Sequence, residues 1–391
     1  MYVYPWDVID QGAESLSDEL AEIGIRTLSI ASSYHAGHFV QPRGKRRRTY
    51  FPEDGVVYFE PSSRLWQNAE ISPRPAAQLA EGNALRDLIV LRDRGGLAVS
   101  CWTVCLHNTR LGLRHPGHVT RNAFGDPNVY SLCPSSPAAR QYARHLVSDL
   151  VTQFGPDCIE IETPGFMRFT HGYHHEKDGL GLTAKQEFLL SICFCEHCRT
   201  RAAAQHVDAE NAASSVRRIL DAAFATETPA HDDGEFGEVG YAALDNASGL
   251  SAYLALRGRT VSTLIGELRD EIAGRSRLMI ITEPQSWREG IDLAAASLAS
   301  DGIATLGYGQ TPKELAAMLA GMRELIGPAK ELAVALRPFV PEISQAPAFT
   351  DLAVAAVQGG ASRLHFYNYG LIPASRLKWI AAAVQAATVP S

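Results

Sequence analysis

Three cysteines within six residues form the most specific chemical pattern in this chain, in the segment Cys193-Phe-Cys195-Glu-His-Cys198. Thiolates at this spacing can surround one tetrahedral metal ion, which needs a fourth ligand from elsewhere in the chain. Cys133 is the first candidate for that ligand, and His197 is the second. Four thiolates leave no open coordination position, so we expect a structural zinc ion. The alternative is a group of buried, unpaired thiols.

A second pattern is the pair of carboxylates in the apolar run Cys158–Thr163. Glu160 and Glu162 are two residues apart, so both side chains point to the same face of a strand. If that face is the interior of a barrel, Glu162 lies at the mouth and Glu160 lies one layer below. A buried carboxylate is costly without a partner, which favours a functional role for at least one of them. An ion pair with an interior cation such as Arg337 is the alternative.

Glu283 ends another apolar run, Ser276–Glu283, in the same way. Neighbouring parallel strands lie about 4.8 Å apart, so carboxylates at the ends of two such strands can face each other. Carboxylates roughly 5–9.5 Å apart are the catalytic pair of glycoside hydrolysis. The sequence therefore predicts Glu162 and Glu283 as catalytic residues. A helix cap or a loop ion pair is the alternative interpretation of Glu283.

Polar or aromatic side chains follow nearly every other expected strand. Aromatic faces stack on sugar rings, while His, Asn and Arg form hydrogen bonds with hydroxyl groups in a fixed geometry. Together they predict a cleft for a polar small molecule. With Glu160, the predicted substrate-binding residues are Asp7, Tyr34, His35, His38, Trp102, His107, Asn108, Tyr308, Arg337, Tyr367 and Asn368.

These side chains must be positioned by an alternation of apolar runs and amphipathic stretches. In the second half of the chain the strands begin about 25 to 30 residues apart, which is typical of βα units with a parallel sheet. Eight such units predict an α/β fold, a (β/α)₈ TIM barrel, with a doubly wound open sheet as the alternative. The expected strands are Tyr2–Val8, Ile25–Ser32, Leu97–Cys105, Cys158–Thr163, Ser276–Glu283, Ile303–Leu306, Glu331–Leu336 and Arg363–Tyr367. The expected helices are Ser15–Ile23, Ala76–Arg94, Pro137–Phe154, Trp287–Ala299, Pro312–Ile326, Phe349–Gln358 and Ala374–Ala387.

Three long insertions interrupt this alternation after strands two, three and four. They cover residues 33–75, residues 106–136 and residues 164–275, and the last is expected to be helical. Because each follows a strand, all three emerge at the C-terminal mouth, where barrel enzymes build their sites. We expect residues 1–391 to form one barrel domain.

The composition excludes several classes of protein. The 391 residues carry a formal net charge of −7 and are 46% hydrophobic, which is too apolar for a disordered chain and unlike a nucleic-acid binder. No apolar stretch reaches the roughly 18 residues that a membrane span requires. The first residues lack the features of a signal peptide, and the 7 cysteines do not suggest a disulfide framework. We therefore expect a cytoplasmic protein.

The segment Tyr130-Ser-Leu-Cys133-Pro-Ser-Ser-Pro137, followed by a helix and then by the three cysteines, resembles a known pattern. It is similar to the zinc site of glycoside hydrolase family 42 β-galactosidases and to a looser group of glycosyl-hydrolase-like barrel proteins. The resemblance implies a (β/α)₈ glycosidase with an acid/base glutamate after strand four, where Glu162 lies.

The leading hypothesis is a glycoside hydrolase that cleaves a small glycoside or oligosaccharide. Glu162 would be the general acid/base, and Glu283 would be the nucleophile or second carboxylate. One alternative is a metal-dependent sugar isomerase or epimerase with His107, Glu162 and Glu283 as ligands. The other is a non-catalytic sugar-binding barrel. All three imply a carbohydrate partner and no nucleic acid or membrane, and all are compatible with a homo-oligomer.

Overall fold

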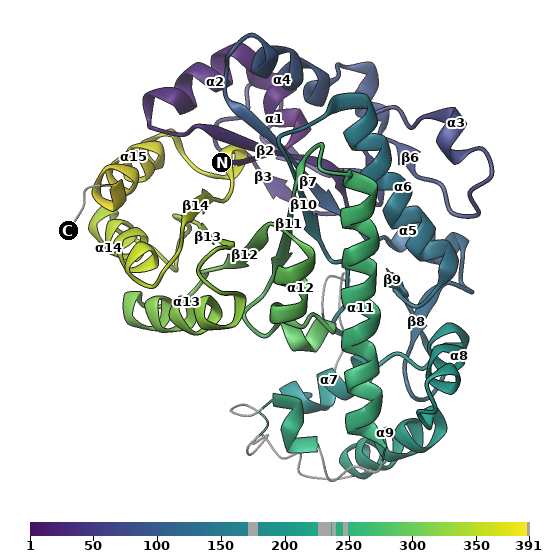
Figure 1. Cartoon of the computed structure of the whole chain (residues 1–391). Coiled ribbons are helices and arrows are strands. Elements are labelled where there is room, and N and C mark those ends of the chain that lie inside the picture. The colour runs from purple at the N-terminus through teal and green to yellow at the C-terminus, as the bar shows by residue number, and fades with distance from the viewer. Residues whose placement is uncertain (171–178, 226–235, 237–239, 245–248, 389–391) are drawn as a thin grey trace.

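The computed structural model describes residues 1–170, 179–225, 236, 240–244 and 249–388, whose elements are shown in Figure 1. Its centre is a mostly parallel sheet with the strand order β14-β13-β12-β11-β10-β7-β2-β5-β6, and β1 pairs with β2. Eight of these strands run parallel and follow one another across the sheet in chain order. They are β1 (Tyr2–Val3), β2 (Thr27–Tyr34), β7 (Ala98–Val104), β10 (Cys158–Glu162), β11 (Arg277–Thr282), β12 (Gly302–Leu306), β13 (Glu331–Leu336) and β14 (Arg363–Phe366).

The first strand is shorter than the sequence predicted. The expected strand Tyr2–Val8 ends at Val3, and helix α1 begins at Pro5. Proline suits the first position of a helix because its fixed φ is helical and its missing N–H needs no partner there. The Asp7 side chain accepts a hydrogen bond from the Tyr4 amide at 2.9 Å and so caps this helix.

The two ends of the parallel sheet are joined by side chains. In the described part of the chain, β14 pairs with β13 and no backbone ladder joins β14 to β1. The Tyr2 hydroxyl and Nδ1 of His365 are hydrogen-bonded at 3.1 Å across this junction. The predicted closed barrel is therefore a curved sheet whose first and last strands meet through side chains.

Helices cover the outer face of the sheet (Figure 1). A separate cluster of buried side chains, rich in aromatic residues, packs together with residues of the strands. Most of the helices follow the strands as predicted, because their apolar residues face the sheet. Their bounds are α1 (Pro5–Gln11), α2 (Ala13–Glu22), α4 (Ala84–Asp93), α6 (Pro137–Phe154), α11 (Leu250–Ile272), α12 (Leu293–Ala299), α13 (Pro312–Ile326), α14 (Ala346–Gln358) and α15 (Ala374–Thr388). None of the described helices is long and apolar enough to cross a bilayer.

Further elements lie in the three long segments after β2, β7 and β10. Figure 1 shows α7, α8 and α9 away from the sheet, with the long helix α11 running from them to the outer layer. The segment after β2 holds β3 (Phe39–Val40), β4 (Thr49–Tyr50), β5 (Val56–Val57), α3 (Ser63–Trp66), β6 (Arg74–Pro75) and the short helix η1 (Ala77–Ala80). The other two hold α5 (Thr109–Arg114), β8 (Val119–Arg121), β9 (Pro127–Leu132), α7 (Ala184–Ser191), α8 (Glu196–Ala204), α9 (Ala209–Phe224) and η2 (Gly240–Leu244).

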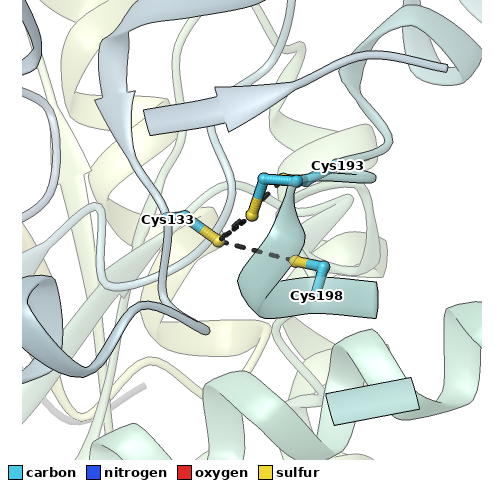
Figure 2. A group of neighbouring side chains, drawn as sticks. Cys133, Cys193 and Cys198 are labelled. Atoms are coloured by element: carbon cyan, nitrogen blue, oxygen red, sulfur yellow. Dashed lines mark hydrogen bonds between the residues drawn. The ribbon is translucent and has the colours of Figure 1, made fainter. Parts of the chain in front are cut away.

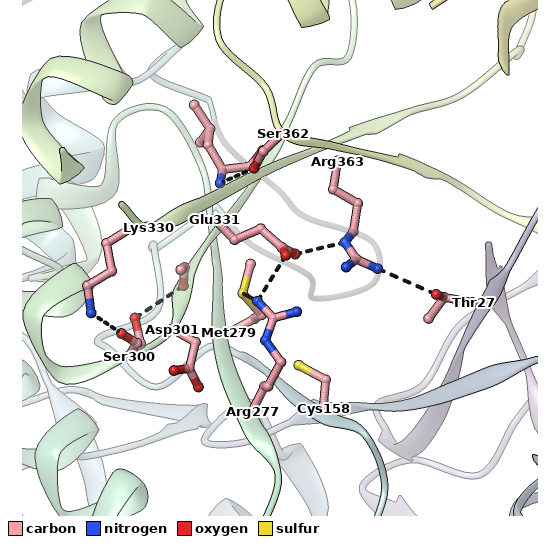
Figure 3. A network of polar contacts seen from close by, with 12 residues as sticks. Thr27, Cys158, Arg277, Met279, Ser300, Asp301, Lys330, Glu331, Ser362 and Arg363 are labelled. Carbon is pink, nitrogen blue, oxygen red and sulfur yellow. Dashed lines mark hydrogen bonds and ion pairs between the residues drawn. The ribbon is translucent and has the colours of Figure 1, made fainter. Parts of the chain in front are cut away.

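Ion pairs fasten the N-terminal end of the sheet (Figure 3). Glu331 of β13 pairs with Arg277 of β11 and with Arg363 of β14, each at 2.9 Å. Arg363 also lies 3.4 Å from the Thr27 hydroxyl of β2, so this network reaches across the junction between the last and first strands. Glu331, Arg277 and Arg363 therefore form one network of ion pairs at this end of the sheet.

Candidate active site

A cavity of about 250 Å³ lies at the C-terminal ends of the parallel strands. A larger hollow of about 350 Å³ lies at the N-terminal end, between β2 and β14. Enzymes with parallel sheets bind substrates at the carboxyl ends of the strands, so we assign the candidate site to the first cavity. Its lining is aromatic and acidic: Tyr2, Tyr34, His35, Trp102, Glu162, Thr163, Ile281, Thr282, Glu283, Glu289, Leu306, Tyr308, Arg337 and Tyr367.

Glu162 is the last residue of β10, and its carboxylate lies beside the indole of Trp102. Trp102 Nε1 donates a hydrogen bond to Oε2 of Glu162 at 2.5 Å. Burial raises the pKa of Glu162 to about 7, the Trp102 hydrogen bond lowers it, and the nearby charge of Glu283 raises it. This carboxyl can therefore hold a proton near neutral pH, as a general acid must.

Glu283 follows β11, the strand beside β10, and it has a cationic partner. Arg168 Nη2 lies 2.5 Å from Oε2 of Glu283, which makes this carboxylate an ion-paired one. The two carboxyl groups of the site therefore have different surroundings: an indole N–H faces Glu162 and a guanidinium faces Glu283. Such a difference is what separates the roles of two carboxylates in one site.

Glu289 is a third carboxylate of the cavity, and it was not predicted from the sequence. The expected helix Trp287–Ala299 is wrong at its start: a short helix η3 (Ser286–Glu289) ends at Gly290, which has φ of 75°, and α12 starts after Asp292. Glu289 therefore lines the cavity. The Gly290 and Asp292 pair was the available indication, because glycine ends helices and aspartate caps them. Burial raises the pKa of Glu289 to about 7, and Arg168, 4.0 Å away, opposes that rise.

The aromatic side chains that line the cavity are held in place by hydrogen bonds and stacking contacts with neighbouring side chains. The Tyr4 hydroxyl lies beneath them and is hydrogen-bonded to the Tyr34 hydroxyl at 3.1 Å and to the Tyr367 hydroxyl at 2.6 Å. Arg337 stacks over the ring of Tyr308 at 4.1 Å. Rigid rings joined in this way can present their faces to a ligand without losing much conformational entropy.

Several predicted substrate-binding residues lie outside this cavity. Asp7 is buried as the cap of α1 and also accepts a hydrogen bond from Gln41 at 2.9 Å. Asn108 and Asn368 accept hydrogen bonds from the amides of Leu111 and Gly370, so they cap α5 and the short helix η4 (Tyr369–Leu371). These side chains follow strands as predicted, but they bind the chain's own backbone.

Three more predicted residues, His38, His107 and Glu160, do not line the cavity either. His38 is exposed and stacks on Phe51 at 4.6 Å. His107 is buried and stacks on the ring of His35 with a centroid distance of 4.4 Å. Of these two histidines, His35 lines the cavity and His107 does not. Glu160 is buried one layer below Glu162, accepts a hydrogen bond from Ser29 at 2.9 Å and lines the hollow at the opposite end.

The four predicted cysteines form one buried group. Figure 2 shows three of them, Cys133, Cys193 and Cys198. Sγ of Cys133 lies 3.9 Å from Sγ of Cys193 and 3.5 Å from Sγ of Cys195 and of Cys198. Zn–S bonds of about 2.3 Å in a tetrahedron separate the sulfur atoms by about 3.8 Å, so the group can hold a metal ion of this kind. His197 is not part of it and stacks on His118 instead.

The mostly parallel sheet and its outer helices define an α/β fold, with an acidic and aromatic cavity at the carboxyl ends of the strands. No family model matches the chain, and neither does any curated protein. Solved structures resemble it at the level of the fold. The glycoside hydrolase domain of PgaB (BpsB) from Bordetella bronchiseptica has a TM-score of 0.61 and 13% identity, over 100% of this chain and 99% of that one.

Two further solved structures agree. The β-galactosidase from the psychrophilic Marinomonas ef1 has a TM-score of 0.57 and 13% identity, over 99% of this chain and 59% of that one. The catalytic domain of the β-amylase from Paenibacillus polymyxa has a TM-score of 0.55 and 11% identity, over 99% of this chain and 98% of that one. At these identities the shared property is the fold, and the predicted similarity to family 42 stays a prediction.

Proposed function

We propose that this chain is a glycoside hydrolase built on a (β/α)₈ barrel, with Glu162 and Glu283 as its two catalytic carboxylates. The observation that carries the proposal is that both residues line one cavity whose walls are aromatic rings. The structural neighbours, a glycoside hydrolase domain, a β-galactosidase and a β-amylase domain, support a carbohydrate substrate.

Glu162 is the general acid of the proposed reaction. Its raised pKa keeps a proton on the carboxyl group near neutral pH. That proton passes to the glycosidic oxygen as the bond between this oxygen and the anomeric carbon breaks, and the leaving group departs as an alcohol. Trp102 orients the carboxyl group from one side through its indole N–H.

Glu283 acts on the anomeric carbon from the other side. In a retaining reaction its carboxylate attacks that carbon, and water later hydrolyses the glycosyl-enzyme with Glu162 as the base. In an inverting reaction Glu283 removes a proton from a water molecule that attacks the carbon directly. Arg168 keeps the Glu283 carboxylate in place in both cases.

The aromatic lining supports recognition of a sugar ring. Faces of Tyr308 and Tyr367 are suited to stacking on the apolar face of a pyranose, and the Arg337 guanidinium beside them can donate to hydroxyl groups. His35 adds a ring that can donate or accept a hydrogen bond at the same cavity. These four residues are therefore the proposed substrate contacts around the two carboxylates.

The cysteine cluster is proposed to bind one structural zinc ion. Four thiolates would complete a tetrahedral coordination and leave no position for a reacting water. The zinc would stabilise the fold, since the free energy of binding a metal adds to the free energy of folding. None of the four cysteines lines the cavity, so the proposed zinc ion has no direct role in the proposed reaction.

The alternative of a metal-dependent isomerase is less well supported. It needs His107, Glu162 and Glu283 around one ion, but His107 does not line the cavity. Among the described residues, the four cysteines are the one group of three or more side chains close enough to share a metal ion.

A screen of the purified protein against aryl glycosides of both anomers tests the proposed function. We expect hydrolysis of at least one member, and proton NMR of the first anomer released separates retention from inversion. Binding of sugars without hydrolysis of any glycoside would favour the non-catalytic sugar-binding barrel instead.

A further inference from the structure

The loop that carries Arg168 is held by two neighbouring segments. The Tyr130 hydroxyl lies 2.9 Å from the carbonyl oxygen of Arg168 and 2.7 Å from that of Phe169, and it donates to this pair. The Phe169 amide donates to Oγ of Ser191 at 2.7 Å. The Met167 amide donates to Oγ of Ser131 at 3.4 Å. The backbone of Arg168 is therefore fixed from both sides.

Both holding segments lead directly into the cysteine cluster. Tyr130 and Ser131 lie on β9, which ends one residue before Cys133. Ser191 is the last residue of α7 and precedes Cys193 by two positions. The cluster joins these two segments, because Cys133 comes from one and the other three cysteines come from the other. Figure 2 shows Cys133 of the first segment facing Cys193 and Cys198 of the second.

Buried contacts around the cluster strengthen this connection. Tyr130, Ser131 and Ser191 are all buried, so water does not readily replace their hydrogen bonds to the loop. On the other side of the cluster, the Arg121 amide donates to Sγ of Cys193 at 3.4 Å. The Phe194 amide donates to the Arg121 carbonyl oxygen at 2.7 Å, which ties the cysteine segment to β8.

Arg168 in turn lies between two carboxylates of the candidate site. Its Nη2 lies 2.5 Å from Glu283, and its Nε lies 4.0 Å from Glu289. A shift of the backbone at residue 168 would therefore change the distances from the guanidinium to both carboxylates. A displacement of about 1 Å is enough to change the geometry of a catalytic group.

We infer that the metal-loaded cysteine cluster positions Arg168, and through it the Glu283 carboxylate. Arg168, Tyr130 and Ser191 are therefore positioning residues and not catalytic ones. The structural link stands on the contacts alone, and only its kinetic consequence rests on the proposed function.

Amide hydrogen exchange of the metal-loaded, full-length protein tests the link without a substrate. Ser191→Ala and Tyr130→Phe each remove one hydroxyl group and keep all four cysteines. We expect exchange in a peptide covering residues 163–170 to accelerate about tenfold in both variants, as for the loss of one buried hydrogen bond. Unchanged exchange in both variants would overturn the inference.

Ser300→Ala is the matched control for these variants. Ser300 is also buried, and its hydroxyl contacts the backbone carbonyl oxygens of Ala296 and Gly302, away from the Arg168 loop. Exchange of the 163–170 peptide should be the same in this variant as in the wild type. Equal acceleration in the control would show general destabilisation and would contradict a specific link.

Removal of the metal with a chelator tests the cluster itself. We expect the 163–170 peptide to exchange faster, and zinc added back to restore its protection. Faster exchange confined to residues 130–135 and 190–199 would separate the cluster from Arg168 and overturn the inference. If the metal-free protein unfolds, the test of the link rests on the Ser191→Ala and Tyr130→Phe variants, because they retain all four cysteines.

Kinetics on a hydrolysed glycoside separates positioning from binding. Ser191→Ala and Tyr130→Phe should lower kcat about three- to tenfold with KM within about twofold, because a displaced Glu283 loses interactions made in the transition state. A raised KM with unchanged kcat would contradict the positioning role. If no glycoside is hydrolysed, the proposed function fails while the exchange result still tests the link.

Discussion

Trp102 donates its indole hydrogen bond to Glu162 from the neighbouring strand, at 2.5 Å. In the ladder between β7 and β10, Trp102 is the partner of Glu160, so its side chain reaches one layer toward the mouth to contact Glu162. The rings of Tyr2 and Tyr34 hold this indole at centroid distances of 5.2 and 5.1 Å. The orientation of the proposed general acid is therefore set by an aromatic cluster and not by another charge.

Replacing Trp102 should shift the pH dependence of the reaction. The indole hydrogen bond favours the ionised carboxyl and lowers the pKa of Glu162, against burial that raises it to about 7. Trp102→Phe removes the donor, so the pKa of Glu162 should rise further. Because the general acid acts when protonated, the alkaline limb of kcat/KM should move to higher pH. A limb that moves to lower pH would contradict this assignment.

Glu289→Gln should stabilise the protein at alkaline pH. Burial raises the pKa of Glu289 to about 7 in the folded state, while the unfolded chain titrates near 4.5. Between these values the folded state binds more protons, so this group lowers the free energy of unfolding as pH rises from 4.5 through 7. The variant lacks this penalty, which is on the order of 1–3 kcal/mol.

Thermal denaturation at two pH values measures this effect. We expect Glu289→Gln to melt above the wild type at pH 8 and close to it at pH 4.5. Glu324→Gln, at an exposed position on α13, is the control and should melt like the wild type at both pH values. A variant less stable than the wild type at pH 8 would show that Glu289 is held as a stabilising ionised group.

Cys195→Ser should reduce both metal content and stability. Sγ of Cys195 lies 3.5 Å from Sγ of Cys133, and its loss leaves three thiolates for the proposed zinc. Elemental analysis should give one zinc per wild-type chain and less in the variant, with a lower melting temperature. Cys105→Ala, a buried cysteine outside the cluster, should keep the zinc. The proposal would be wrong if wild-type protein held no metal after growth with zinc and purification without a chelator.

The parallel strands were predictable because each is a short, continuous apolar run. Seven of the eight expected strands match the observed ones to within about two residues, from β2 through β14. The first differs because Pro5 and Asp7 together start a helix, a local effect that outweighs the apolar character of Val8. The grouping of the four cysteines was also predictable, since the spacing of possible metal ligands indicates which side chains can come together without knowledge of the fold.

The composition of the cavity was harder to predict, because a polar residue after a strand has two common uses. Glu162 and Glu283 line the cavity, whereas Asn108 and Asn368 satisfy the first amides of short helices. Periodicity alone does not distinguish these uses. Glu289 and Arg168 were missed because their positions depend on a helix start and on a loop held by distant side chains.

The most direct test of the central claim is the turnover of Glu162→Gln on a series of glycosides with different leaving groups. This variant keeps the shape of the side chain and removes its proton. Turnover of unactivated glycosides should fall by about two to four orders of magnitude, with a smaller loss on activated aryl glycosides that need little protonation. Glu283→Gln should instead slow all substrates alike, because its carboxylate acts at the anomeric carbon. Near-normal turnover of unactivated glycosides by Glu162→Gln would remove Glu162 from the mechanism.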